Sequence, residues 1–357
     1  MSRHLRTWWH LIGPVVLVVI VATGGMATSP TIQFQLRSVL VTAAIVVALY
    51  SFVGNSGVIS FGHVSFVAVG AFAAGVATAP ADVKPGTFSK MLPFLAKLEI
   101  GSLESLLLAA ALGASYALFV GIPLMRLSGL SAGIATFAVL IITHNVLRNW
   151  EAIGPGAKTL ALVPQTTGFL QASLGLIVVM GAAYGYQRSR WGRQLRATRE
   201  DPAAAQAAGI DIHRQRLVAF TLSGALSGLA GALLVHLLGS ITTEQVFLDL
   251  TFVTLAMLVV GGMGSLWGAV VGAFLIAGLD VVLVELEKGA TVAGVAVDLP
   301  SGTRLLVLGV LMFLVLVLRP DGITGGRELT WPFRRPGASV VVSPGGAGDP
   351  EPSATGR

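Results

Sequence analysis

Polar side chains that could bind a small solute gather in one short stretch of an otherwise apolar sequence, between residues 55 and 65. Polar groups at membrane depth are costly, and they usually face a cavity or a partner helix. Glycine and serine also permit a local break in a helix, and the freed backbone groups can coordinate a solute. A single histidine is more typical of a packing residue than of a ligand, so the prediction rests on the whole cluster. We predict a translocation pathway at Asn55, Ser60, Gly62, His63 and Ser65.

A densely charged segment interrupts the apolar sequence from Arg188 to Arg216. It carries seven arginines against three acidic residues. One interpretation is a basic loop that contacts anionic lipid. The other is a surface that a cytoplasmic partner recognises.

A short helix is predicted in the middle of this charged segment, from Pro202 to Ala208. Asp201 is a good N-cap, proline suits the first helical position, and Gly209 suits the C-cap. A well-capped surface helix flanked by arginines is typical of an element that docks into a groove of another protein.

Several kinds of chemistry are excluded or unsupported. The chain has no cysteine, which excludes disulfides and thiolate metal sites. Its 6 histidines are scattered without metalloprotease spacing, and no Ser-His-Asp or paired-carboxylate arrangement stands out. The chain also lacks the G-x-x-x-x-G-K-[ST] sequence of an ATPase. We therefore expect no enzymatic activity, metal site or cofactor in this chain.

The composition predicts an all-α polytopic membrane protein. The chain has 357 residues, of which 54% are hydrophobic and 11% charged, whereas soluble domains average about 25% charged residues. Apolar runs of about twenty residues recur along it, and alternating strand patterns are absent. The formal charge of +6 is typical of cytoplasmic loops and does not indicate a nucleic-acid partner.

Ten membrane spans are predicted. An uncleaved first span is favoured over a signal peptide because its apolar run is long and further spans follow. The hinges at Asn55 and at residues 262–264 could instead belong to broken or re-entrant segments. The predicted spans are 11–28, 36–53, 58–79, 103–124, 129–147, 168–186, 215–239, 247–262, 265–284 and 303–319.

The distribution of basic residues predicts the orientation. With both termini in the cytoplasm, most of the 23 lysines and arginines lie on the inner side. Residues 1–330 form the predicted transmembrane domain. The tail 331–357 is rich in Pro, Gly and Ser, and we expect a disordered cytoplasmic tail there.

Two further patterns concern packing and polar groups. Small residues recur every four positions around Gly224 and Gly228, which predicts close helix packing. His144, His236 and Glu244 fall near the predicted outer ends of spans, where we expect solvated side chains. Acidic residues deep in spans are scarce, which disfavours an ion-driven secondary transporter.

Four stretches resemble, in the same order, the permease subunits of branched-chain amino-acid ABC importers. They are GNSGVISFGHVSFVAVGAF, ATREDPAAAQAAGIDIHRQRLVAFTLSGALSGLAGAL, VVGGMGSLWGAVVGAF and GTRLLVLGVLMFLVLVLRPDGI. The resemblance covers about residues 36 to 325. A further stretch, RLSGLSAGIATFAVLIITHNVLRNW, is similar to the M-type subunit of this family more than to the H-type.

The resemblance implies a fold, partners and a mechanism. Family members pair with a second permease, commonly of H-type, and with two cytoplasmic ATPase subunits that hold ATP and magnesium. An extracytoplasmic binding protein delivers the solute, and the complex lies in the bacterial cytoplasmic membrane. The coupling helix, which contacts an ATPase subunit, would here carry Glu200, Asp201, Ala204, Ala205 and Gly209.

The sequence departs from the family pattern after Trp150. A Thr-Gly-Gly-like segment is usual there, and this chain has Ile153-Gly-Pro-Gly-Ala-Lys-Thr159 in a predicted outer loop. The sequence therefore does not identify the transported solute. Similar permeases carry branched-chain amino acids, urea, short amides or aromatic acids. A stand-alone secondary transporter or channel is a further alternative, as is a membrane scaffold or biosynthetic enzyme that transports nothing.

Overall fold

The computed structural model describes residues 3–82, 84, 90–287, 290–292, 295–297, 300, 303–319, 321–326 and 328. Helices make up almost all of the regular structure in these residues. The predicted disordered tail, 331–357, lies outside them. The helices are α1 (Arg3–Gly25), α2 (Pro30–Ser56), α3 (His63–Thr78), α5 (Pro93–Lys97), α6 (Ser102–Leu124), α7 (Gly129–Asn149), α8 (Phe169–Arg188), α9 (Arg190–Glu200), α10 (Pro202–Ala207), α11 (Ile212–Leu238), η1 (Glu244–Val246), α12 (Leu248–Gly261), α13 (Leu266–Glu287) and α14 (Thr303–Leu318).

Each predicted span coincides with a helix, which confirms the polytopic helical membrane bundle. Within the described residues, 7 helices are long and apolar enough to cross a membrane, and α1 and α3 contribute shorter apolar helices. The number ten therefore stays a prediction. The sequence did not predict one small element, the antiparallel hairpin of β1 (Ala290–Val292) and β2 (Val295–Val297).

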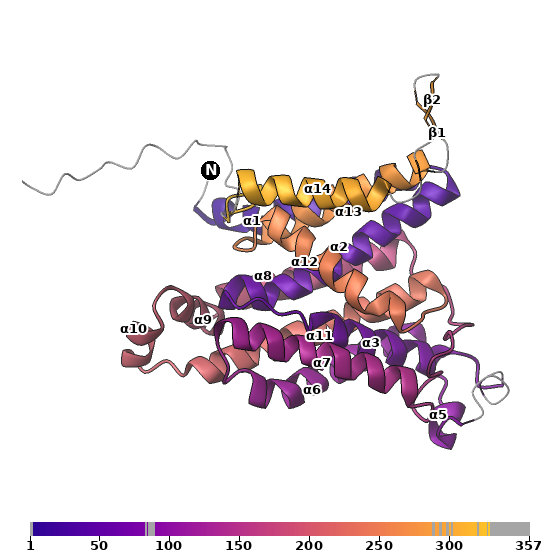
Figure 1. Cartoon of the computed structure of the whole chain (residues 1–357), viewed down its shortest axis with the longest axis horizontal. Coiled ribbons are helices and arrows are strands. Elements are labelled where there is room, and N and C mark those ends of the chain that lie inside the picture. Colours follow the sequence, from indigo (N-terminus) through magenta and orange to yellow (C-terminus); the bar gives the residue numbers. More distant parts are fainter. Residues whose placement is uncertain are drawn as a thin grey trace, which may run out of the picture.

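Two helices, α2 and α11, form the centre of the bundle. From Val39 to Ser56, every residue of α2 except Thr42 is buried, and α11 packs against α2, α3 and α6. Most of the long helices run lengthwise between two ends of the molecule (Figure 1). The α9–α10 segment protrudes at one end, on the left of Figure 1, and α5 lies at the other.

Glycines let the central helices touch through their backbones. A Cβ placed on Gly228 of α11 would overlap the carbonyl oxygen of Ala109 on α6, and one on Gly70 of α3 would overlap the carbonyl oxygen of Gly228. In lipid, such close approach replaces the hydrophobic driving force that helix association has in water. The predicted packing role of Gly228 is therefore confirmed.

Candidate translocation and coupling sites

The predicted pathway residues surround the break between α2 and α3. Helix α2 ends at Ser56, Gly57 adopts the left-handed conformation with φ 70°, and α3 begins at His63. The backbone N–H of Phe61 donates to Oγ1 of Thr136 on α7 at 3.2 Å. The interruption predicted at Asn55 therefore lies just after it, at residues 57–62, and a hydrogen bond to α7 holds it in place.

His63 lies in an aromatic enclosure. Its ring centroid is 5.4 Å from that of Phe52, 5.6 Å from that of Phe66 and 5.4 Å from that of Phe220. Its Nδ1 forms a hydrogen bond of 2.8 Å with Oγ of Ser60. The other ring nitrogen, Nε2, is buried and has no hydrogen-bond partner among the described residues. The imidazole is therefore packed as part of the core, and one of its two nitrogens forms no hydrogen bond with the described residues.

The other three pathway residues are buried as well. Asn55 donates from Nδ2 to the carbonyl oxygen of Ser51 at 2.9 Å. Gly62 lies so close to the backbone of Thr136 that a Cβ would come within 2.5 Å of its carbonyl oxygen. Ser65 is fully buried, and its Oγ has no partner within the described part of the chain. The structure gathers the predicted residues around one break, and their role in translocation remains a prediction.

Four cavities lie among the described residues, and none of the five pathway residues lines them; the smallest, about 440 Å³, is formed by the second half of α7. The largest, about 810 Å³, lies among α3, α5, α6 and α7 and has no charged lining side chain. A second, about 730 Å³, lies among α2, α12 and α13 and includes Asp280. The third, about 590 Å³, lies beside the α2–α3 break and includes Arg199 and Arg216.

The predicted docking helix is present as α10, and its N-terminus is capped as expected. Oδ1 of Asp201 accepts hydrogen bonds from the backbone N–H groups of Ala203, at 2.9 Å, and Ala204, at 3.0 Å. These are donors that a helix start would otherwise leave unpaired. Proline occupies the first helical position, as expected.

A Schellman motif closes the other end of α10. Gly209 has φ 79°, its N–H donates to the carbonyl oxygen of Gln206 at 2.9 Å, and the N–H of Ile210 donates to that of Ala205 at 3.0 Å. This pair of bonds requires a left-handed residue at the glycine position. The predicted C-cap is confirmed.

The predicted coupling residues differ in exposure. Asp201, Ala204 and Gly209 are exposed at the protruding end, whereas Ala205 is 4% exposed and packs within the chain. Ala205 is therefore not available to a partner in this conformation. Glu200 is exposed but is the last residue of α9, two positions before the first residue of α10, the helix that it was expected to help form.

Arginines of α9 anchor the segment to the bundle. Nη1 of Arg199 donates to the carbonyl oxygen of Gly54 in the last turn of α2, at 3.0 Å. Nη2 of Arg196 donates to the carbonyl oxygen of Gln187 near the end of α8, at 2.7 Å. A cation at a helix C-terminus also interacts favourably with the helix dipole. Some of the arginine in this segment thus has a structural role at helix ends.

Glu328 links three parts of the chain at this end of the bundle. Its carboxylate accepts hydrogen bonds from the backbone N–H groups of Leu266, at 2.8 Å, and Trp267, at 3.3 Å, in the first turn of α13. It also accepts one from Nε2 of Gln187 at 3.3 Å. The sequence gave no indication of this cap, because Glu328 lies about sixty residues from the helix that it caps.

Replacing Glu328 with alanine is expected to lower the free energy of unfolding by about 1–2 kcal/mol, since it removes a charged cap from α13. A Glu328→Gln chain keeps an acceptor oxygen and is expected to lose less. Thermal unfolding of the purified chain in detergent checks this order. A Glu328→Ala chain as stable as the wild type would contradict the capping role.

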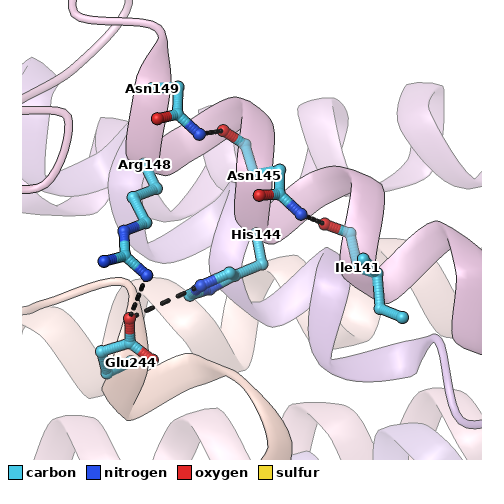
Figure 2. A network of polar contacts seen from close by, with 6 residues as sticks. All are labelled: Ile141, His144, Asn145, Arg148, Asn149 and Glu244. Atoms are coloured by element: carbon cyan, nitrogen blue, oxygen red, sulfur yellow. Dashed lines mark hydrogen bonds and ion pairs between the residues drawn. The ribbon is translucent and has the colours of Figure 1, made fainter.

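The C-terminal end of α7 carries a polar network that joins this helix to η1 (Figure 2). Oε1 of Glu244 lies 3.2 Å from Nη1 of Arg148 and 3.5 Å from Nε2 of His144. The imidazole of His144 stacks on Phe247 with 3.9 Å between ring centroids. Nearby, Nδ2 of Asn145 donates to the carbonyl oxygen of Ile141 within the same helix at 2.9 Å (Figure 2).

The expectation of solvated side chains at this end is wrong for both histidines. His144 is 8% exposed and His236 is 1% exposed, while Glu244 is exposed as expected. Nδ1 of His236 lies 3.0 Å from the carbonyl oxygen of Pro164, and Nε2 forms a hydrogen bond of 2.8 Å with Oγ of Ser105. These contacts come from loops and helices far away in sequence.

Comparison with known proteins gives a consistent family match. Residues 31–316 match the family described as "Branched-chain amino acid transport system / permease component". The chain is 26% identical to the high-affinity branched-chain amino acid transport system permease protein LivM of Escherichia coli, over 76% of this chain and 64% of LivM. This chain therefore spans somewhat less than two thirds of that relative.

Other relatives have different solutes in their names. The chain is 30% identical to the probable branched-chain amino acid transport permease protein LivH of Methanocaldococcus jannaschii, over 44% of this chain and 48% of LivH. It is 27% identical to the autoinducer 2 import system permease protein LsrC of an Enterobacter strain, over 60% of this chain and 62% of LsrC. A shorter match, 34% identical over 26% of this chain and 27% of its relative, is to the fructose import permease protein FrcC of Rhizobium meliloti.

Proposed function

Because the chain belongs to the family of permease components of branched-chain amino acid transport systems, we propose that it is the M-type membrane subunit of an ATP-driven importer. The exposed, doubly capped helix α10 carries this proposal. A helix of six residues is not stable by itself. The caps keep α10 folded without a partner and so present it ready for binding.

The proposed partners supply what this chain lacks. A second permease, of H-type, would complete the pathway, two cytoplasmic ATPase subunits would bind ATP and magnesium, and an extracytoplasmic protein would deliver the solute. LivM and LivH relatives among the matches support a pair of different permeases. Lipid surrounds the remaining apolar surface, which includes exposed side chains such as Leu130 and Phe119.

Coupling would pass from α10 to the pathway through α9. An ATPase subunit bound to Asp201, Ala204 and Gly209, with Glu200 beside them, would move α10 and α9 together. Arg199 connects α9 to the end of α2, next to the break that the pathway residues surround. ATP can shift the permease only if the closed ATPase pair binds its two conformations with different affinity.

The proposed solute is a branched-chain amino acid, with other small solutes as alternatives. The names of LivM and LivH support the amino acid, whereas those of LsrC and FrcC refer to autoinducer 2 and fructose. Urea, short amides and aromatic acids are the other candidates. The chain would lie in the bacterial cytoplasmic membrane with both termini inside, as the distribution of lysine and arginine predicts.

Uptake by the reconstituted complex tests the function. We expect vesicles that contain the chain, its partner permease, the ATPase subunits and the binding protein to accumulate leucine, isoleucine or valine only when ATP is supplied on the ATPase side. Fructose, urea, a short amide and an aromatic acid are measured in parallel. Accumulation of one of these solutes instead would show that the proposed solute is wrong. Flux through this chain alone, without ATP, would show that it is a channel or a carrier and not an importer subunit.

A further inference from the structure

The 590 Å³ cavity beside the α2–α3 break is built from several elements that meet at the protruding end of the bundle. Gly57 and Ile59 come from the break, Leu130 from the start of α7, Arg199 from α9, and Arg216 from the start of α11. We call this space the basic cavity. The translocation pathway predicted above does not use it.

Two guanidinium groups make the basic cavity cationic. Arg199 and Arg216 line it, and no aspartate or glutamate is among the described lining residues. Arginine offers five N–H donors. The described contacts engage one nitrogen of each, through Gly54 for Arg199 and through Leu127, at 3.1 Å, for Arg216. Nε of Arg216 is buried without a hydrogen-bond partner in the described structure. An anion in the cavity would supply the missing acceptors.

Apart from Ser56 and Thr198, the rest of the wall is apolar, and it opens to the outside of the subunit. Ile59 is 42% exposed and Leu130 is 80% exposed, and Val53, Val58 and Met263 continue this surface inward. A ligand that fits must therefore combine an anionic head with an apolar body. A basic pocket between membrane helices on the cytoplasmic side is a typical site for the headgroup of an anionic lipid.

We propose that the basic cavity binds an anionic phospholipid, with the phosphate between Arg199 and Arg216 and an acyl chain along Ile59 and Leu130. Arginine forms charge-assisted, often bidentate hydrogen bonds with phosphate. The proposal concerns a lipid site of this subunit, and it stands or falls independently of the transported solute.

Bound lipid would also affect the segment proposed to couple the permease to ATP hydrolysis. Pro202, the first residue of α10, lines the same cavity, and Arg199 fastens α9 to the end of α2. A phosphate held between the two arginines would fix the α9–α10 segment against the α2–α3 break. Bound lipid would thus favour one position of the α9–α10 segment, and the amount of lipid bound would regulate coupling to the ATPase subunits.

The test measures lipid retained by the full-length chain, purified in mild detergent, by native mass spectrometry. Phosphatidylglycerol is titrated against phosphatidylcholine. An Arg199→Gln/Arg216→Gln chain is compared with an Arg190→Gln/Arg193→Gln chain, which loses the same charge from exposed positions of α9 outside the cavity. We expect the first pair to weaken phosphatidylglycerol binding about tenfold or more and the second about twofold or less.

A single Arg216→Gln chain guards against a folding defect, because it keeps the contact between Arg199 and α2. It is expected to keep the wild-type thermal midpoint and still bind phosphatidylglycerol more weakly. Equal losses in the two double variants would overturn the proposal in favour of diffuse attraction to a basic loop. Displacement of the lipid by inorganic phosphate or by leucine at equal concentration would also overturn it, since a free anion or a solute carboxylate would then suffice.

Discussion

A Gly209→Val chain is expected to insert into the membrane and to lose most of its ATP-driven uptake. Gly209 has φ 79°, a conformation that costs a residue with a side chain roughly 1–2 kcal/mol, and more if it is β-branched. Apart from the two chain neighbours, no atom of the described residues lies within 4 Å of a Cβ built there. The defect is therefore one of backbone conformation, which opens the Schellman motif of α10. Uptake and recovery of the ATPase subunits with the chain are the measurements.

A Gly209→Asn chain is the matched control. Asparagine tolerates the left-handed region better than other residues with a side chain, so it should keep most of the uptake. An Asp201→Ala chain, which loses the N-cap, should resemble the valine variant. Normal uptake by Gly209→Val would contradict the role of the left-handed cap.

A Gly228→Leu chain is expected to lose the folded bundle. A side chain at Gly228 would overlap the carbonyl oxygen of Ala109, which belongs to the backbone and cannot move aside. Overpacking against side chains costs roughly 1–3 kcal/mol, and we expect about 3 kcal/mol or more here. The yield of monodisperse protein in size-exclusion chromatography and the thermal midpoint measure the effect.

The same substitution at Gly181 provides the comparison. Gly181 lies in α8, and apart from its chain neighbours and the adjacent turns of the α8 backbone, no atom of the described residues lies within 4 Å of a Cβ built on it. A Gly181→Leu chain should therefore fold, with a thermal midpoint near that of the wild type. Equal yields of the Gly228→Leu and Gly181→Leu chains would show that the close contact of α6 and α11 does not hold the bundle together.

Local sequence signals predicted the helices and the caps of α10. Aspartate, proline and glycine act on backbone groups within a few residues, so Asp201 and Gly209 could be assigned from the sequence alone. The break before His63 was predictable for the same reason, because glycine and serine interrupt an apolar run there.

Contacts between distant residues could not be predicted. The bond from Arg199 to Gly54 joins residues 145 positions apart, and the cap that Glu328 gives to α13 spans 62 positions to Leu266. Burial of His144 and His236 likewise depends on Phe247 and Ser105, which other elements supply. The sequence showed only that these residues are polar and near predicted helix ends, which is why both histidines were expected to be solvated.

The most direct test of the importer is what accompanies the chain out of its own membrane. We expect the tagged chain, purified in mild detergent, to bring with it a second permease and a pair of ATPase subunits. The ATPase subunits should be lost from an Asp201→Ala/Gly209→Val chain that still inserts and still holds the second permease. Recovery of the chain by itself, still moving solute after reconstitution without ATP, would contradict the account and identify a channel or secondary transporter.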